Sequence, residues 1–156
     1  MIIRNDKGLK NDFKIRLVKH ISFLEKELGD YTKFHALSWN DYSEVRDKRR
    51  NVERWIENIV TSSVDIARII LAAEDKMLPD TYKELVITLS LVPGFDQDNT
   101  KKLSEWVRFR NIIVHEYLDI KWKSIKKFIQ ETEVIYREFL NRVKSYLNEK
   151  LEQEES

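Results

Sequence analysis

Residues 103–117, LSEWVRFRNIIVHEY, say more about the architecture of this chain than any other part of it. At 100° per residue, most of their large apolar side chains fall within one helical arc of about 120°, with Arg110 in its middle. The members of this arc are Leu103, Trp106, Val107, Arg110, Ile113, Val114 and Tyr117. Phe109 and Ile112 make the opposite side apolar as well. Such a helix is either central in a helical bundle or shared with a second subunit.

Four more helices are expected around this one. Apolar residues at spacings of three and four predict the first, and Ser38-Trp39-Asn40-Asp41 resembles a capping box that opens the second. Pro79 is expected to end the second helix. The residues of that helix expected to face inward are Val45, Val52, Ile56, Ile59, Ile66 and Ile70. The five predicted helices cover about Leu9–Leu28, about Trp39–Met77, Thr81 to about Leu91, Asp96 or Asp98 to about Val114, and about Lys121–Leu147.

Composition supports the same fold class. Three glycines and two prolines in 156 residues are too few for the many turns of a sandwich or barrel. We therefore predict an all-α, up-and-down bundle of about five helices, forming one domain over residues 1–156 with frayed tails at 1–8 and 149–156. No apolar segment is long enough for a signal peptide or a membrane span, so we expect a cytoplasmic protein with no membrane contact.

Several classes of function are excluded or poorly supported by the residues. The absence of cysteine excludes disulfide scaffolds, thiol catalysis and Cys-based metal sites. The three histidines are far apart and no glycine-rich phosphate loop or nucleophile elbow is present, so we expect no metal and no bound cofactor. With 28 basic and 27 acidic residues, nucleic-acid binding would need a local patch.

Arg110 and His115 are the first candidates for chemistry. An arginine inside an apolar stripe must be paired, and it cannot lose its charge. It is either one half of a structural Arg–carboxylate pair or a functional group. His115 lies about 140° round an ideal helix from Arg110, and it is either a cap or surface residue or a catalytic one. The two residues could meet if the helix unwinds near His115, or if a two-fold axis brings Arg110 of a second subunit opposite.

Basic residues cluster at the start of the second predicted helix, at Arg46, Lys48, Arg49, Arg50 and Arg54. Farther along the same helix, Arg54, Asn58, Thr61, Asp65 and Arg68 follow a helical spacing and form one polar stripe. This surface is either a solvated helix face or a phosphate-binding rim that leads to a catalytic centre. Arg46, Arg49, Arg50 and Arg54 are the candidates for RNA contact, and Lys121, Lys123, Lys126 and Lys127 could extend the rim.

The segment 109–117, FRNIIVHEY, resembles the motif of the HEPN superfamily, specifically the HepT-like toxins of HEPN–MNT toxin–antitoxin systems. The pattern is Arg-Asn, three apolar residues, His, an acidic residue and Tyr. Segments 52–58, 64–67 and 78–84 resemble the long second helix and the third-helix entry of that family.

The resemblance implies a dimer whose two Arg–His motifs face a shared cleft, and a metal-independent ribonuclease toxin that acts on tRNA or mRNA. By match, Arg110 and His115 would be catalytic, with Asn111 as a supporting polar residue. Tyr117 would be the residue that a small MNT-type nucleotidyltransferase antitoxin adenylylates, with ATP used by that partner. The residue types fit, because RNA supplies its own 2′-OH nucleophile, histidine can move a proton near neutral pH, and arginine can hold a phosphate.

Two other functions remain open. One is a non-catalytic HEPN module that binds nucleotides or presents a substrate to a nucleotidyltransferase. The other is a helical dimer with a purely structural role. A short nucleotidyltransferase gene beside this one would favour the toxin.

Overall fold

The computed structural model describes the backbone of residues 6–155 and the side chains of residues 11–154. Over that range the chain is all-α, with eight α-helices, two short 3-10 helices and no strand, which confirms the predicted fold class. The α-helices are α1 (Asp6–Gly29), α2 (Tyr31–His35), α3 (Trp39–Glu44), α4 (Arg46–Ala73), α5 (Tyr82–Thr88), α6 (Gln97–His115), α7 (Trp122–Glu131) and α8 (Glu133–Glu155). The 3-10 helices are η1 (Leu89–Leu91) and η2 (Tyr117–Asp119).

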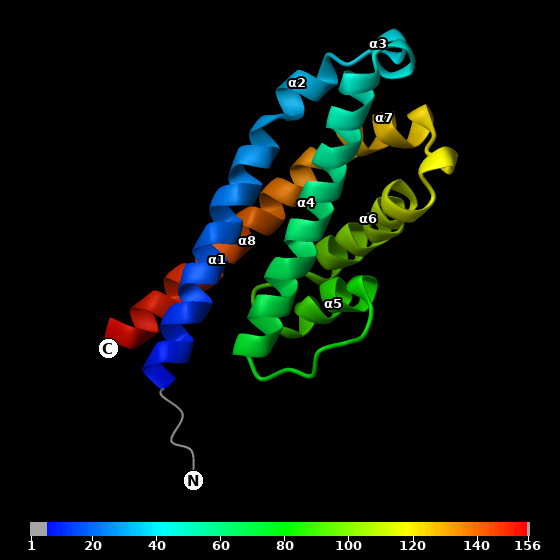
Figure 1. The fold of residues 1–156 in the computed structure, drawn as a ribbon. Helices are drawn as coiled ribbons and strands as arrows, with labels where there is room; N and C mark the ends of the chain where they lie inside the picture. The colour runs from blue at the N-terminus through cyan, green and yellow to red at the C-terminus, as the bar shows by residue number, and fades with distance from the viewer. Residues whose placement is uncertain (1–5, 156) are drawn as a thin grey trace.

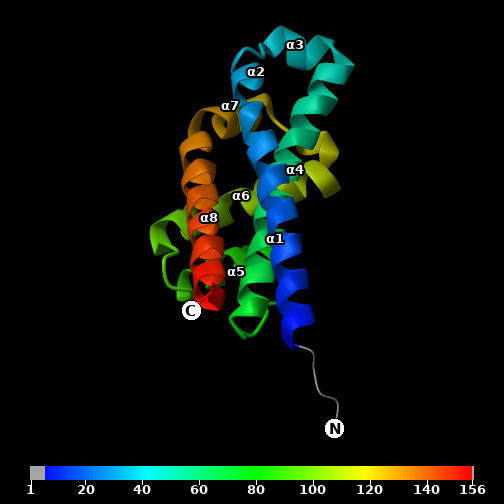
Figure 2. The ribbon, with the colours of Figure 1, turned by 90° about the vertical axis from the view of Figure 1, so that its left-hand side faces the viewer.

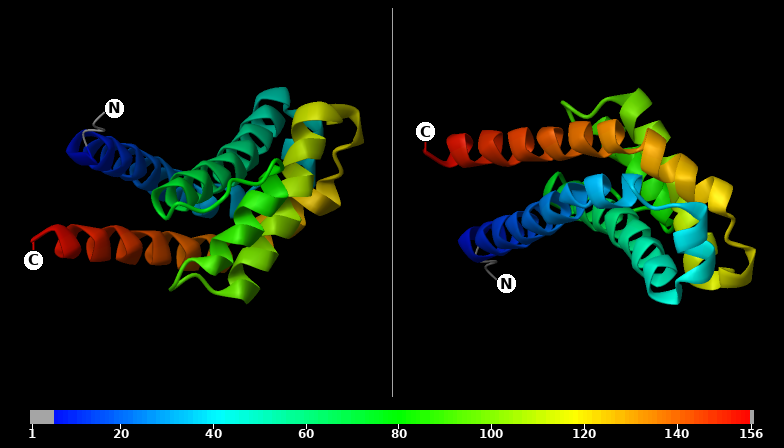
Figure 3. Two further views of the ribbon diagram at one scale, coloured as in Figure 1. Left: turned by 90° about the horizontal axis from the view of Figure 1, so that it is seen from below. Right: turned by 90° about the horizontal axis from the view of Figure 1, so that it is seen from above.

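Helix α4 is the centre of the bundle (Figure 1). It packs against α1 on one side and against α5 and α6 on the other, while α8 packs against both α1 and α6. The first turns of α1 and the end of α8 lie side by side, where Lys14 forms an ion pair with Glu154 (Figure 2). In the end-on views, α1 and α8 extend together on one side of the molecule, and α5 and α6 lie on the other (Figure 3).

Burial of apolar side chains from all the long helices holds these layers together. On α4, Ile56, Ile59, Ile66 and Ile70 are fully buried. Complete burial of one such side chain is worth roughly 1.5–3 kcal/mol. The spacing of these four residues matches the inward face predicted for this segment, so the sequence pattern located the core of α4 correctly.

An aromatic cluster fixes the end of the bundle where α2, α4 and α7 meet. The ring centroids of Tyr31 and Trp55 are 4.7 Å apart, and those of Trp55 and Phe128 are 5.6 Å apart, both edge-to-face. The Trp55 indole donates a hydrogen bond to the Glu27 carbonyl oxygen at 2.8 Å, which satisfies one of the free carbonyls at the end of α1. Helix α2, which we did not predict, carries Tyr31 into this cluster.

The second predicted helix is in fact two helices. The capping box at Ser38 is confirmed, but the helix that it opens, α3, ends at Glu44. Val45 is extended, with φ −106° and ψ 101°, and it is exposed rather than directed inward. Helix α4 begins only at Arg46.

Helix α4 also ends several residues before Pro79, the residue that was expected to terminate it. Asp75 adopts a positive φ of 55° beyond Ala73, its amide donates to the Ala72 carbonyl at 3.2 Å, and the Lys76 amide donates to the Leu71 carbonyl at 2.9 Å. These are the two hydrogen bonds of a Schellman motif, with an aspartate where glycine is more common. The local turn, and not the proline, therefore ends the helix.

The last predicted helix bends at Thr132, which separates α7 from α8. The Thr132 hydroxyl donates to the Phe128 carbonyl at 2.6 Å, and this bond competes with regular helix geometry. Helix α8 continues to Glu155, past residue 149, where the frayed tail was expected to begin. Most of the predicted N-terminal tail lies outside the described residues, and α1 already covers residues 6–8.

Candidate functional site

Arg110 lies on α6 and is held by groups from α4, α5 and its own helix. Its Nε donates a hydrogen bond to the Thr61 hydroxyl of α4 at 3.1 Å. One terminal nitrogen donates to the Asn111 side-chain oxygen at 3.1 Å. Its guanidinium carbon lies 5.1 Å from the centre of the Tyr82 ring, at the start of α5. Three neutral side chains thus fix the orientation of a charged group that is half-buried.

The positive charge of Arg110 has no carboxylate partner. Among the described side chains, no ion pair includes this residue. The interpretation as a structural Arg–carboxylate pair is therefore wrong. Because an arginine stays charged, a guanidinium that is held by neutral groups remains available to an anion such as a phosphate.

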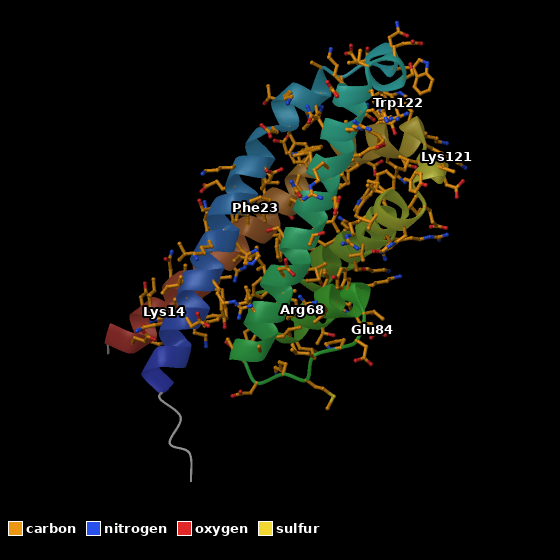
Figure 4. All side chains as sticks on the ribbon, viewed as in Figure 1. Lys14, Phe23, Arg68, Glu84, Lys121 and Trp122 are labelled. Atoms are coloured by element: carbon orange, nitrogen blue, oxygen red, sulfur yellow. The ribbon has the colours of Figure 1, made fainter. Side chains whose placement is uncertain are left out.

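Tyr82 contacts a second arginine as well. The Arg68 guanidinium carbon of α4 lies 5.7 Å from the centre of the same ring, and this arginine is paired with Asp65 at 3.1 Å. Figure 4 shows Arg68 near the last turns of α4. The predicted polar stripe on α4 is confirmed at Thr61, Asp65 and Arg68, which face the site from one helix. Sequence reasoning did not single out Tyr82, although the Thr81 cap that begins α5 marks its position.

His115 is the last residue of α6 and is exposed. The Glu116 amide still donates to the Ile112 carbonyl at 2.8 Å, so the helix does not unwind before His115. On a regular helix the two motif residues remain about 140° apart. Of the two ways in which Arg110 and His115 could meet, the structure removes unwinding and leaves the two-fold arrangement.

Tyr117 follows in the short helix η2, where the chain leaves the direction of α6 at Glu116. Its side chain is 69% exposed, and that of Leu118 is 87% exposed. Within α6 itself, Phe109 and Ile113 are buried in the single chain, and Trp106 and Ile112 are half-buried. The apolar surface left open near the motif is therefore the turn after the helix and not the helix itself.

The four arginines predicted to contact RNA are exposed along the first turns of α4. Arg54 pairs with Glu57 at 3.4 Å. It is seven residues from Thr61, about 10 Å along the helix axis. Arg46 is fifteen residues from Thr61, about 22 Å along the axis. Of the four arginines, Arg54 is thus the nearest to Thr61 along α4, and Arg46, Arg49 and Arg50 lie farther toward the start of the helix.

The described part of the chain has neither a cluster of metal-ligating side chains nor a membrane-spanning helix. Among the described side chains, those of residues 11–154, no group of three or more His, Asp or Glu is arranged to hold a metal ion. In the same range, no helix combines the length and the apolar character needed to cross a membrane.

The sequence matches the family described as "Ribonuclease HepT-like" over residues 24–143. A search of curated proteins found no significant match.

Among solved structures, the chain is similar to the cytosolic protein of unknown function YutE from Bacillus subtilis, with 17% identity, a TM-score of 0.74, and coverage of 87% of this chain and 91% of that one. It is similar to a tri-AMPylated HEPN toxin from Shewanella oneidensis in complex with an MNT antitoxin, with 16% identity, a TM-score of 0.74, and coverage of 83% and 96%. A toxin–antitoxin structure with AMP-PNP matches at 16% identity and a TM-score of 0.72, with coverage of 86% and 98%. At these identities, the likenesses show a shared fold.

Proposed function

The chain belongs to the HepT-like ribonuclease family, and from this premise we propose that it is a metal-independent endoribonuclease toxin of a HEPN–MNT toxin–antitoxin pair. The observation that carries the proposal is the state of Arg110. Its guanidinium is fixed by Thr61, Asn111 and Tyr82 and has no carboxylate partner among the described side chains, and it lies five residues before the exposed His115. A structural arginine has no need of this arrangement, whereas a phosphate-binding one does.

The proposed reaction is cleavage of an RNA phosphodiester by the neighbouring 2′-OH. The 2′ oxygen attacks phosphorus, the bond from phosphorus to the 5′ oxygen breaks, and the products are a 2′,3′-cyclic phosphate and a free 5′-hydroxyl. His115 transfers a proton, from the attacking hydroxyl or to the leaving oxygen. Arg110 stabilises the negative charge that develops on the phosphate oxygens, and Asn111 orients the guanidinium.

A two-fold dimer would complete this site. Because α6 stays regular through His115, the histidine of one protomer would act beside Arg110 of the other. Exposed Leu118 and half-buried Val114 lie on the turn and helix end that would meet across the axis. The RNA substrate, tRNA or mRNA, would reach the cleft past Arg54, with Arg46, Arg49 and Arg50 contacting phosphates farther away.

The proposed partner is an MNT-type nucleotidyltransferase antitoxin, which uses ATP to adenylylate Tyr117 in the cytoplasm. The similar fold of an AMPylated toxin bound to an MNT antitoxin supports this proposal, and so does the exposure of the Tyr117 phenol. In the transfer, the phenolic oxygen bonds to the α-phosphorus of ATP, pyrophosphate leaves and the phenol proton is released. The added nucleotide brings a bulky anion to the cleft, which would repel and block RNA.

Induced expression tests this function. With the chain alone we expect growth arrest and RNA decay, and with the neighbouring nucleotidyltransferase gene we expect normal growth. A His115→Ala variant expressed at the same level should permit growth. Arrest by that variant, or no arrest by the wild type, would favour the non-catalytic nucleotide-binding module instead.

A further inference from the structure

A groove of about 360 Å³ lies between α1 and α4, next to the Arg110 site. Helix α1 contributes Lys19, His20 and Phe23, and Figure 4 shows Phe23 on α1 beside α4. Helix α4 contributes Asn58, Thr61, Ser62 and Asp65. The volume is at the small end of the range for ligand sites, which suits one nucleotide unit better than a folded partner.

Ser62, on α4, has a buried hydroxyl beside this groove. Its side chain is 3% exposed, and its hydroxyl has no hydrogen-bond partner among the described residues. A buried hydroxyl without a partner is costly, typically by 1–3 kcal/mol, so native proteins usually provide one. The Ser62 hydroxyl therefore lies just behind the wall of the groove, and rotation of its side chain would turn it toward a group bound there.

Phe23 contributes an exposed aromatic face to the groove. It is a large apolar side chain that is 41% exposed on a groove lined mainly by polar residues. An aromatic face that is open to solvent beside hydrogen-bonding groups is the arrangement on which single-stranded bases stack. Lys19, beside it on α1, offers a positive charge to a phosphate.

Thr61 joins the groove to the proposed catalytic site. It lines the groove, and its hydroxyl accepts the hydrogen bond from Arg110 Nε at 3.1 Å. The Thr61 side chain therefore lies between the groove and a phosphate that Arg110 would hold.

We propose that this groove binds the nucleotide of the RNA substrate next to the scissile phosphate. The base stacks on Phe23, its polar edge bonds Ser62, and its phosphate lies toward Lys19. The inference rests on the proposed function, since it takes Arg110 as the residue that holds the scissile phosphate.

Proton NMR of the histidines tests the assignment, because the chain has only three of them and each lies in a different place. His20 lines the groove, His115 ends α6, and His35 ends α2, near Glu133. The probe is a dinucleotide whose first sugar is 2′-deoxy, so that it cannot be cleaved. We expect saturable shifts of the His20 and His115 ring signals and none at His35.

The outcomes separate this inference from the proposed function. A shift at His115 alone would overturn the groove assignment and leave the nuclease intact. A shift at His20 alone would support the groove and contradict the role of His115. No shift at either residue would overturn both.

Kinetics with RNA provide the second test. Phe23→Leu should raise KM about tenfold with kcat within about twofold, because stacking is lost and the reacting groups are untouched. Phe23→Tyr keeps the aromatic face and should stay within about threefold of the wild type. Val18→Ala is the matched control on the exposed side of α1, outside the groove. An unchanged KM for Phe23→Leu, or a changed sedimentation mass that marks a protein interface, would overturn the proposal.

Discussion

Arg110 is held by neutral groups on three different helices, and the proposed function rests on this arrangement. Thr61, Asn111 and Tyr82 restrict the guanidinium without neutralising it. Arginine keeps its charge at any ordinary pH, so such a site favours an anion throughout the physiological range. The FRNIIVHEY segment made Arg110 a candidate, but sequence reasoning left a structural carboxylate pair open, because the partner of a helical arginine depends on tertiary packing.

Thr61 should act as a positioning residue for Arg110. Thr61→Val keeps the volume but removes the oxygen that accepts from Arg110 Nε, so we expect kcat on RNA to fall about tenfold with the melting temperature nearly unchanged. Thr61→Ser keeps the hydroxyl and should retain most of the activity. Equal losses in the two variants would show that Thr61 acts through packing only.

The proposed role of Tyr117 depends only on an exposed phenol. Tyr117→Phe should keep much of the nuclease activity and resist the nucleotidyltransferase, because no oxygen remains to accept the adenylyl group. Mass spectrometry after incubation of the wild type with partner and Mg-ATP should find one adenylyl group on the Tyr117 peptide. If the Phe variant is neutralised as readily as the wild type, inhibition acts by covering the cleft.

For the long helices, the sequence predicted their existence and their buried faces better than the residues at which they end. The breaks at Val45 and Thr132 carry no proline or glycine, and the break at Thr132 includes a contact made elsewhere in the fold. The Thr132 hydroxyl bonds the Phe128 carbonyl and also lies 2.5 Å from the Tyr31 hydroxyl, about a hundred residues away in sequence. Local pattern reasoning cannot see such a contact.

The join between α4 and α8 gives a pH-dependent prediction. Glu74, just beyond α4, accepts hydrogen bonds from Tyr146 at 2.6 Å and from Lys150 at 2.8 Å. Partial burial acts to raise the pKa of Glu74, but the hydrogen bonds from Lys150 and Tyr146 and the Lys150 charge outweigh it and lower the pKa below 4.5. A lowered pKa stabilises the folded state above the pKa of the unfolded chain, and this stabilisation is lost as the pH falls through the folded value.

Glu74→Ala should therefore reduce the free energy of unfolding by about 1–2 kcal/mol at pH 7, and by clearly less at pH 3.5. Urea unfolding at the two pH values measures the difference. Glu105→Ala, a carboxylate on α6 that is exposed and has no ion pair among the described side chains, is the control and should change stability by less than about 0.5 kcal/mol. An equal cost at both pH values would contradict the role given to the Glu74 charge.

Helix α4 connects the two proposed parts of the RNA site, the Arg110 site and the groove. One side of it carries Thr61 toward Arg110 on α6, and its contact with α1 forms the groove. His115 lies at the exposed end of α6, turned away from Arg110 by the regular helix. In a single chain, Arg110 and His115, the two residues of the proposed catalytic centre, therefore lie apart.

Mixed dimers test whether a second subunit joins these halves. Arg110→Ala and His115→Ala should each be inactive alone, but a mixed dimer would hold one complete site. Random reassortment after mild unfolding and refolding should recover about a quarter of the wild-type activity, because half of the dimers are mixed and each has one of two sites. No recovery, with mixed dimers shown by mass, would place both residues of a site in one protomer.

The most direct measurement is cleavage of a labelled single-stranded RNA by the purified chain in the presence of EDTA. We predict that the wild type cleaves it and leaves a 2′,3′-cyclic phosphate, and that His115→Ala, folded as judged by its helical circular dichroism, does not. Cleavage that survives in folded His115→Ala, or that disappears from the wild type when EDTA is added, would contradict a metal-free nuclease centred on Arg110 and His115.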